Sequence, residues 1–231
     1  VDSSTDDVRT QILALFRDEV KDHSPSFISN IVEYLRIEPT IRISDAHVSS
    51  EHVAFDNGIL CLNTGEFIPH TPSIITMYSV RGSYLPNDNC YTPCFDRYML
   101  MLCNNDPVLV TRAIQVLGYI LTPDIKAKAI FTVLGPGSSG KSLLVKLLEN
   151  LLSPTSFYAI QSDKLKNNFA LAELFGRSLC VCQDMPNEAL DTKAVSCMKC
   201  ISGADTISSD VKFKSAITFL CRAKLLLVSN F

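Results

Sequence analysis

The chain has 231 residues, 47% of them hydrophobic, and a mean hydropathy of +0.18, which is enough apolar material to build one large or two small domains around a core. No apolar run approaches the roughly 20 residues that a membrane-spanning helix needs, so we expect no membrane partner. The formal net charge of −3 excludes a surface that is basic overall, so any contact with nucleic acid has to come from a local cluster.

The nine cysteines, together with an acidic start that lacks the apolar segment of a secretion signal, favour reduced thiols in an intracellular compartment. The bacterial cytoplasm, a virus replication site and an organelle fit this composition equally well. Cys197 and Cys200 have C-x-x-C spacing, but no second pair completes a zinc site. Cys180 and Cys182 lie in an apolar run and are expected in the core.

Residues 1–75 are expected to form a helical region followed by small β structure. Apolar residues at helical spacing predict helices over residues 8–22 and 27–37. Turn signals at Asn57-Gly58 and at Asn63–Glu66, between short apolar stretches, predict hairpins. The histidines of this region have no ligand spacing and are interpreted as surface or hydrogen-bonded residues; they are His47, His52 and His70.

Residues 76–125 are expected to form a second region, a connector followed by helices. Several prolines predict an extended connector over residues 71–93. Residues 94–103 have helical spacing, and Asn105-Asp106-Pro107 supplies the cap residues and first-turn proline that begin another helix. Pro123 is expected to end that helix. The third expected region, residues 126–231, contains the motif on which the functional interpretation depends.

That motif is a glycine-rich loop between an apolar strand and a helix. The run Ala129–Leu134 predicts the strand, and apolar residues at helical spacing after the loop predict the helix. Between them, the pattern G-x-x-x-x-G-K-[ST] is matched by Gly135, Pro136, Gly137, Ser138, Ser139, Gly140, Lys141 and Ser142. The alternative is a glycine- and serine-rich turn before a surface helix, which the flanking strand and helix disfavour.

The residue types of this loop suit a nucleoside triphosphate, and ATP with Mg²⁺ is the expected pair. Glycines let consecutive N–H groups point at a phosphate, and the N-terminus of the following helix adds positive charge. Lys141 is predicted to reach the β- and γ-phosphates, and the Ser142 hydroxyl is predicted to ligate Mg²⁺. The loop is therefore predicted to bind ATP.

A second apolar strand is followed by the acid that such a site needs. The stretch Ser178–Gln183 is apolar, and Asp184 follows it. A carboxylate at the carboxyl end of a neighbouring strand can hold Mg²⁺ or its water. Asp184 is therefore predicted to be a metal ligand and catalytic residue, with Glu188 and Asp191 as alternatives because many buried strands end in aspartate.

The last part of the chain adds two candidates. The apolar run Ala223–Ser229 predicts a strand that ends at Asn230, whose amide could orient the water that attacks the γ-phosphate. Before it, Lys212, Phe213 and Lys214 form a basic–aromatic–basic tip. The lysines could contact nucleic-acid phosphates while the phenylalanine packs on a base or sugar, or the tip could simply be a solvated hairpin edge.

Taken together, these motifs resemble superfamily 3 helicases, in particular the helicase part of phage, plasmid and large-DNA-virus primase-helicases. Gly135–Ser142 is similar to the family's motif A, Asp184 to motif B, and Leu226–Asn230 to motif C, with Asn230 as the sensor asparagine. The segment from Lys199 to Lys214 is similar to the motif between B and C, which implies a DNA-contacting hairpin. The resemblance covers roughly residues 55–231.

The chain also departs from that family. The family often has a second acid beside motif B, where this chain has Gln183. The sequence therefore leaves open which group polarises the attacking water, and Glu188 could take the place of that acid. The family's arginine finger and C-terminal lid would lie beyond Phe231, so the sequence is expected to be a fragment with weak activity of its own. No catalytic acids of a primase are recognisable. Whether the protein has an attached primase domain or acts with a separate primase is left open by the sequence.

The expected fold class is α/β, a parallel-sheet P-loop NTPase core of the AAA+ type, truncated at its C-terminus and preceded by a helical and small β region. The resemblance implies an ATP-dependent DNA helicase that acts in replication as a hexameric ring around single-stranded DNA. Two alternatives remain: a P-loop kinase of small molecules or nucleosides, and a non-catalytic module that binds nucleotide or partner subunits.

Overall fold

A computed structural model describes residues 25–37, 49–76, 78–86, 91–165, 168–185, 190–211 and 214–230. The chain divides into two compact units, Val1–His47 and Val48–Phe231. In the first unit, helix α2 (Pro25–Ile37) confirms the helix expected over residues 27–37, with a proline at its first position. The helix expected over residues 8–22 lies outside the described residues. The region boundaries expected near residues 75 and 125 both fall within the second unit and stay predictions.

The second unit begins with a small antiparallel sheet, which confirms the expected hairpins. Its strands are β1 (His52–Phe55), β2 (Gly58–Cys61) and β3 (Phe67–Ile68), in the order β1-β2-β3. The turn between β1 and β2 needs its glycine, because a Cβ at Gly58 would lie 2.6 Å from the carbonyl oxygen of Ile68. His52 accepts or donates a hydrogen bond with Ser49, as expected for a structural histidine.

The connector after β3 is packed rather than loose. The side-chain oxygen of Asn57 accepts from the N–H of Tyr84 at 2.8 Å, and its amide donates back to the Tyr84 carbonyl at 2.9 Å. The Tyr84 ring lies 5.1 Å from the rings of both Phe55 and Phe67, centroid to centroid. Earlier in the connector, Ser79 forms a bridge with Ala54 of β1, and Val80 forms one with Leu152, the residue that follows helix α5 (Lys141–Leu151). The connector therefore ties the small sheet to the end of α5.

Two helices follow the connector, as the sequence predicted. Helix α3 spans Pro93–Leu102, and helix α4 spans Pro107–Ile120. Asp106 caps α4, since its side chain accepts from the N–H groups of Val108 and Leu109. The turn between the helices holds Asn104 and Asn105 in the left-handed region, which asparagine tolerates better than most residues. The expected cap and proline thus begin α4.

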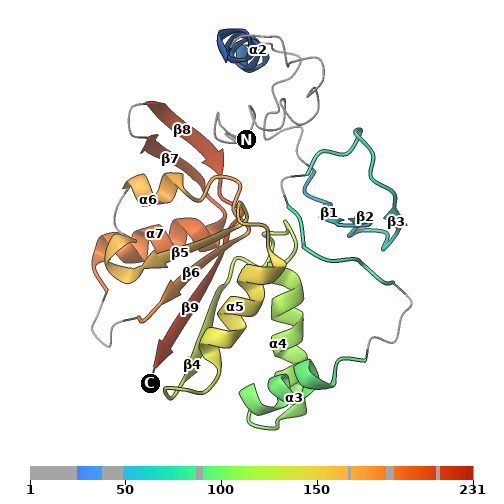
Figure 1. Ribbon diagram of the computed structural model, residues 1–231. Coiled ribbons are helices and arrows are strands. Elements are labelled where there is room, and N and C mark those ends of the chain that lie inside the picture. The colour runs from blue at the N-terminus through green and yellow to red at the C-terminus, as the bar shows by residue number, and fades with distance from the viewer. Residues whose placement is uncertain are drawn as a thin grey trace. The chain divides into compact units, whose positions relative to one another are not determined.

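A four-stranded parallel sheet organises the rest of the unit, with helices on both faces (Figure 1). The strand order is β4-β9-β6-β5, and the strands are β4 (Ile130–Gly135), β9 (Lys224–Asn230), β6 (Leu179–Gln183) and β5 (Phe157–Gln161). The connecting helices are α5 (Lys141–Leu151), η3 (Ser162–Lys164), α6 (Asn168–Ala172) and α7 (Thr192–Gly203). An antiparallel hairpin, β7 (Thr206–Val211) with β8 (Lys214–Leu220), precedes β9. The fold is therefore α/β, as expected.

The two central strands, β6 and β9, are apolar over most of their length, which allows both of their faces to be buried. Alternate residues point to opposite faces of a strand. On one face, Leu179 and Val181 of β6 pack with residues of α4 and α5, including Ile120 and Leu148. On the other face, the intervening cysteines of β6 pack with α6, α7 and the β7–β8 hairpin. The result is a sheet between two helical layers.

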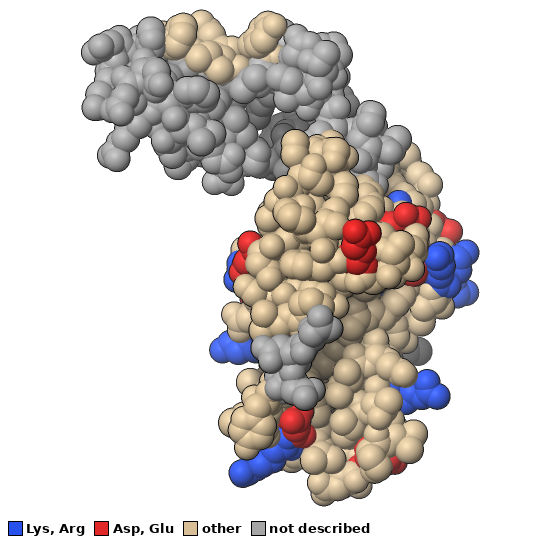
Figure 2. Space-filling view, turned by 90° about the vertical axis from the view of Figure 1, so that its right-hand side faces the viewer, with Lys and Arg blue, Asp and Glu red and all other residues tan. Residues whose placement is uncertain are grey.

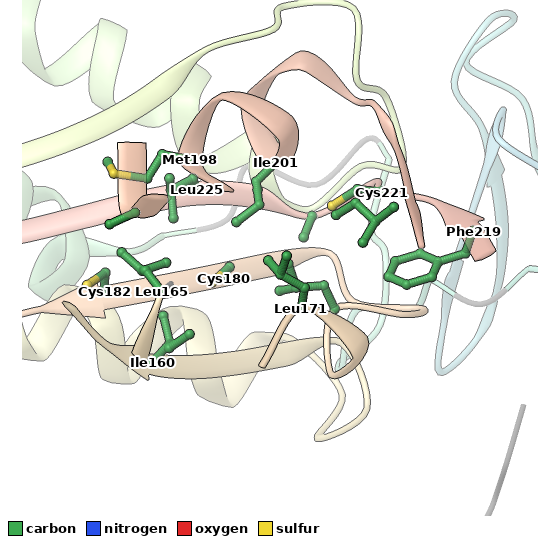
Figure 3. Packing of buried hydrophobic residues seen from close by; sticks show 14 residues of the cluster. Ile160, Leu165, Leu171, Cys180, Cys182, Met198, Ile201, Phe219, Cys221 and Leu225 are labelled. Atoms are coloured by element: carbon green, nitrogen blue, oxygen red, sulfur yellow. The ribbon is translucent and has the colours of Figure 1, made fainter. Parts of the chain in front are cut away.

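Figure 3 shows the second of these faces, with Met198 and Ile201 of α7 opposite Cys180 and Cys182. The prediction that these two cysteines belong to the core is confirmed, since both are fully buried. Burial raises the pKa of the Cys182 thiol to about 11, which keeps it protonated near neutral pH. The described part of the chain contains no group of three or more metal-ligating side chains, and none of its helices is long and apolar enough to cross a membrane.

Candidate functional site

The residues predicted to bind nucleotide and metal lie at the carboxyl edge of the parallel sheet. Strand β4 ends at Gly135 and β9 ends at Asn230, and these two residues are partners in the register of the two strands. Figure 1 shows the end of β9 beside the loop that leads into α5. Because parallel strands all point the same way, their carboxyl ends form a single edge where loops and ligands meet. The fold thus brings residues about 95 positions apart into contact.

The glycine-rich loop turns into α5 through a left-handed residue. Gly140 has a φ of 93° and is the N-cap of α5. It offers no side-chain oxygen to cap the helix, so the N–H groups of Lys141 and Ser142, which precede the first helical hydrogen bonds, face a ligand or water. Ser138 also has a positive φ, of 60°. The loop is therefore shaped by backbone conformations that glycine permits most easily.

Lys141 lies folded into its own loop. Its side chain is only 6% exposed. Its Nζ donates to the carbonyl oxygens of Gly135 at 2.8 Å and Pro136 at 2.6 Å, and to the Ser139 hydroxyl at 3.2 Å. An ammonium group has three N–H donors, so all of them are used within the loop. A phosphate that approached the loop would compete with these acceptors.

A cavity of about 360 Å³ opens above the loop. Its lining consists of Gly137, Ser138, Ser139, Gly140, Lys141, Ser142 and Asn230. The volume is within the range of small-molecule sites. The structure therefore brings Asn230 together with the loop in one cavity, while Gly135 and Pro136 contact Lys141 beneath it.

Asp184 lies at the same edge but does not line that cavity. It follows β6 with a φ of 54° and an exposed side chain. Strands β4 and β6 flank β9, so they lie about 10 Å apart, twice the usual spacing of about 4.8 Å between neighbouring strands. The segment after Asp184 is fixed to β9, because the Ser229 hydroxyl donates to the Met185 carbonyl at 3.1 Å.

The alternatives to Asp184 have different positions. Glu188 lies outside the described residues. Asp191 is the N-cap of α7, where its carboxylate accepts from the N–H of Lys193 at 2.9 Å. Sequence reasoning missed Asp163, which follows β5 at the same edge of the sheet. The negative charges of Asp163 and Asp184 both raise the pKa of Cys182, so both carboxylates lie near the end of β6. The sequence signal that could have indicated Asp163 is an acidic residue two positions after the end of a predicted strand.

The hairpin expected between the two motif strands is present. Strands β7 and β8 are antiparallel, with an irregularity between Ser209 and Val211. Lys214 is the first residue of β8, and Lys212 and Phe213 lie outside the described residues. Only the first residue of β8 thus belongs to the described part of the predicted tip, and the role of the tip in binding DNA stays a prediction.

Comparisons with known proteins relate separate parts of the chain to two families. Residues 8–103 match a family described as D5 N terminal like. Residues 133–231, which include the loop and Asn230, match a family of unknown function, DUF5906. No curated protein matches the chain significantly in sequence.

Among solved structures, the fold is similar to that of the NrS-1 C terminal region. An apo structure of that region (305–718) has a TM-score of 0.52 and 14% sequence identity, covering 78% of this chain and 54% of that one. A second apo structure, in the A form, has a TM-score of 0.51 and 15% identity, with the same coverage. The chain thus spans about half the length of these structures, and the similarity establishes a shared fold.

Proposed function

We propose that this chain is the nucleotide-binding part of an ATP-dependent DNA helicase of the primase-helicase type, with a P-loop NTPase core of superfamily 3. The observation that carries the proposal is the cavity in which the loop Gly137–Ser142 and Asn230 face the same space. A parallel sheet, a glycine-rich loop that enters a helix N-terminus, and an amide on the adjacent strand suit a nucleoside triphosphate. The match to the D5 N terminal like family and the fold shared with the NrS-1 C terminal region support the primase-helicase part.

In this proposal, Lys141 exchanges its contacts with the loop for contacts with the triphosphate. The carbonyls of Gly135 and Pro136 are neutral acceptors, whereas phosphate oxygens are charged, and charge-assisted hydrogen bonds are stronger. Ligand binding would therefore draw the ammonium group out of the loop. Asn230, at the cavity wall, would orient the attacking water against the γ-phosphate.

The donor set at this edge fits a magnesium ion. Hydroxyl and carboxylate oxygens are the ligands that Mg²⁺ prefers, and Ser142 and Asp184 supply one of each. Both side chains are exposed, so they are accessible to an ion that also contacts the phosphates. Mg²⁺ would neutralise charge that develops on the phosphates during hydrolysis. Asp163 is a further carboxylate at this edge, and it could hold a water of the ion.

Single-stranded DNA is the proposed second ligand, bound through Lys212, Phe213 and Lys214. On the face shown in Figure 2, Lys and Arg side chains are scattered, some of them beside Asp and Glu, and do not form one basic patch. With a formal net charge of −3, this distribution requires a local contact. A hairpin that presents two lysines and an aromatic ring would provide it, and a ring of subunits would bring several hairpins to a central pore.

The test compares three activities of the purified protein. ATP hydrolysis is measured with and without single-stranded DNA, and phosphate transfer to nucleosides is measured in parallel. We expect weak hydrolysis that depends on Mg²⁺ and is stimulated by DNA. Phosphorylation of a nucleoside would instead favour a P-loop kinase, and nucleotide binding without turnover would favour a non-catalytic module.

A further inference from the structure

Helix α3 contacts the glycine-rich loop at Gly140. The Tyr98 hydroxyl donates a hydrogen bond to the carbonyl oxygen of Gly140, at 3.0 Å. A Cβ at Gly140 would lie 3.3 Å from Cε2 of Tyr98 and 3.9 Å from Cδ1 of Leu102 and Cε of Met101. Gly140 therefore lines the cavity and also packs closely against α3.

The Gly140 carbonyl, to which Tyr98 donates, also accepts the first backbone hydrogen bonds of helix α5. It accepts from the N–H groups of Leu143 at 3.0 Å and Leu144 at 3.2 Å. Because a peptide group is planar and trans, its carbonyl and the next N–H point in opposite directions. A hydroxyl that fixes the Gly140 carbonyl therefore fixes the direction of the Lys141 N–H as well. Because glycine has the fewest steric limits on its own backbone, a hydrogen bond from outside the loop adds a restraint at Gly140 that the residue itself does not supply.

Tyr98 itself is held by packed elements. Met99, next to it on α3, is only 1% exposed. The end of α3 is closed by a hydrogen bond of 2.7 Å from the N–H of Asn105 to the Leu100 carbonyl. Helix α4 is anchored to the sheet through the fully buried Ile120. Burial also raises the pKa of Tyr98, so its hydroxyl keeps the proton that it donates.

We propose that Tyr98 is a positioning residue for nucleotide binding, which holds the Gly140–Lys141 peptide in the orientation that receives a phosphate. This inference rests on the proposed function, because the orientation of the peptide affects affinity only if the loop binds nucleotide. It assigns a role in the site to α3, which belongs to the part of the chain matched by the D5 N terminal like family, whereas the loop belongs to the DUF5906 match.

The test uses Tyr98→Phe, which keeps the ring and removes the hydroxyl. The matched control is Tyr158→Phe, a half-buried tyrosine on β5 that packs against the α7 face of the sheet. The affinity for a fluorescent ATP analogue is measured with Mg²⁺. Because a single hydrogen bond contributes about 0.5–1.5 kcal/mol, Tyr98→Phe should weaken binding about 2- to 10-fold. Tyr158→Phe should leave the affinity unchanged.

Amide hydrogen exchange of the chain without nucleotide provides the second measurement. Tyr98→Phe should speed exchange in peptides that cover residues 138–146, because the first turn of α5 loses its restraint, and Tyr158→Phe should not. Unchanged exchange in Tyr98→Phe, or faster exchange with unchanged affinity, would overturn the proposal. If the wild-type chain binds no nucleotide while exchange responds as expected, the proposed function fails and the contact between Tyr98 and the loop stands.

Discussion

At the scale of single residues, the glycine-rich loop before α5 ends in a left-handed glycine, Gly140. Gly140 combines a φ of 93° with an atom of Tyr98 only 3.3 Å from where a Cβ would lie. Gly140→Ala should therefore reduce the free energy of unfolding by about 1–2 kcal/mol and weaken nucleotide binding. Gly137→Ala is the control for stability, because Gly137 has no left-handed φ and no atom within 4 Å of its Cβ position. Urea denaturation of both variants checks this, and equal stabilities would contradict it.

A second residue-scale prediction separates the two carboxylates near the end of β6. Asp184→Asn should slow Mg²⁺-dependent ATP hydrolysis by at least about 10-fold, with a smaller effect on nucleotide affinity, since a metal-holding carboxylate acts mainly on charge developed at the phosphates. Asp163→Asn should have a lesser effect on hydrolysis, because β5 lies one strand farther from the loop than β6. A larger loss of hydrolysis in Asp163→Asn than in Asp184→Asn would show that the metal-ligating acid is misassigned.

Lys224, at the start of β9, lies at the edge of the sheet opposite the cavity. It is only 4% exposed, its Nζ donates to the Thr122 carbonyl, and it lies 5.2 Å from the centroid of the Tyr119 ring. Burial lowers its pKa to about 7, an effect that Asp124 opposes and Arg222 assists. In the unfolded chain the ordinary lysine pKa of about 10.4 applies. Between these two values the folded protein binds fewer protons than the unfolded chain, so stability rises with pH.

This linkage gives a pH-dependent prediction. From pH 7.0 to 8.5 the free energy of unfolding should rise by up to about 2 kcal/mol through Lys224. Above about pH 9 the buried thiols of Cys182 and Cys221 oppose the rise, because their pKa is raised to about 11 and their contribution is lost as pH increases. Lys224→Met should remove the rise between pH 7.0 and 8.5. Urea denaturation at both pH values checks this, and an equal rise in the variant would assign it to other groups.

At the scale of elements, the β7–β8 hairpin is the unit for which we propose DNA binding. Replacing Lys212 and Lys214 with alanine should weaken binding of labelled single-stranded DNA, and the slope of log affinity against log salt should fall by up to about 1.4, since each phosphate contact contributes about 0.7. Nucleotide affinity should stay nearly unchanged. The control replaces Lys126 and Lys146, two exposed lysines outside the hairpin, and should leave the slope as it is. Fluorescence anisotropy at several salt concentrations measures both pairs, and equal slopes would mark the tip as an ordinary solvated turn.

The elements also show which parts of the structure were accessible from the sequence. The strands that frame the site were predicted because β6 and β9 are buried on both faces and therefore read as continuous apolar runs. Helix α4 was predicted from its cap and proline, and the glycine-rich loop from its motif. Each of these predictions depends on a few consecutive residues and therefore needs no knowledge of contacts between distant parts of the chain.

At the scale of the whole molecule, the remaining features depend on contacts between distant residues. Nothing near Tyr98 in the sequence indicates that its hydroxyl reaches Gly140, 42 positions away. The packing of the proline-rich connector on the small sheet arises in the same way, from the Asn57 side chain binding the Tyr84 backbone. The adjacency of Asn230 and Gly135 follows from the strand order, which places β9 between β4 and β6. Spacing in the sequence does not determine that order.

The central claim is that the loop before α5 binds the phosphates of ATP through Lys141. The most direct measurement is the dissociation constant of a fluorescent ATP analogue, with Mg²⁺, for the wild-type chain, Lys141→Ala and Lys146→Ala. Lys146 lies on the same helix but is exposed and outside the cavity, so it controls for loss of a positive charge. We predict that the wild-type chain and Lys146→Ala bind equally well, and that Lys141→Ala loses at least about 10-fold in affinity, as expected when charge-assisted hydrogen bonds to phosphate are removed. Equal affinities in all three proteins, or no binding by the wild-type chain, would contradict the account.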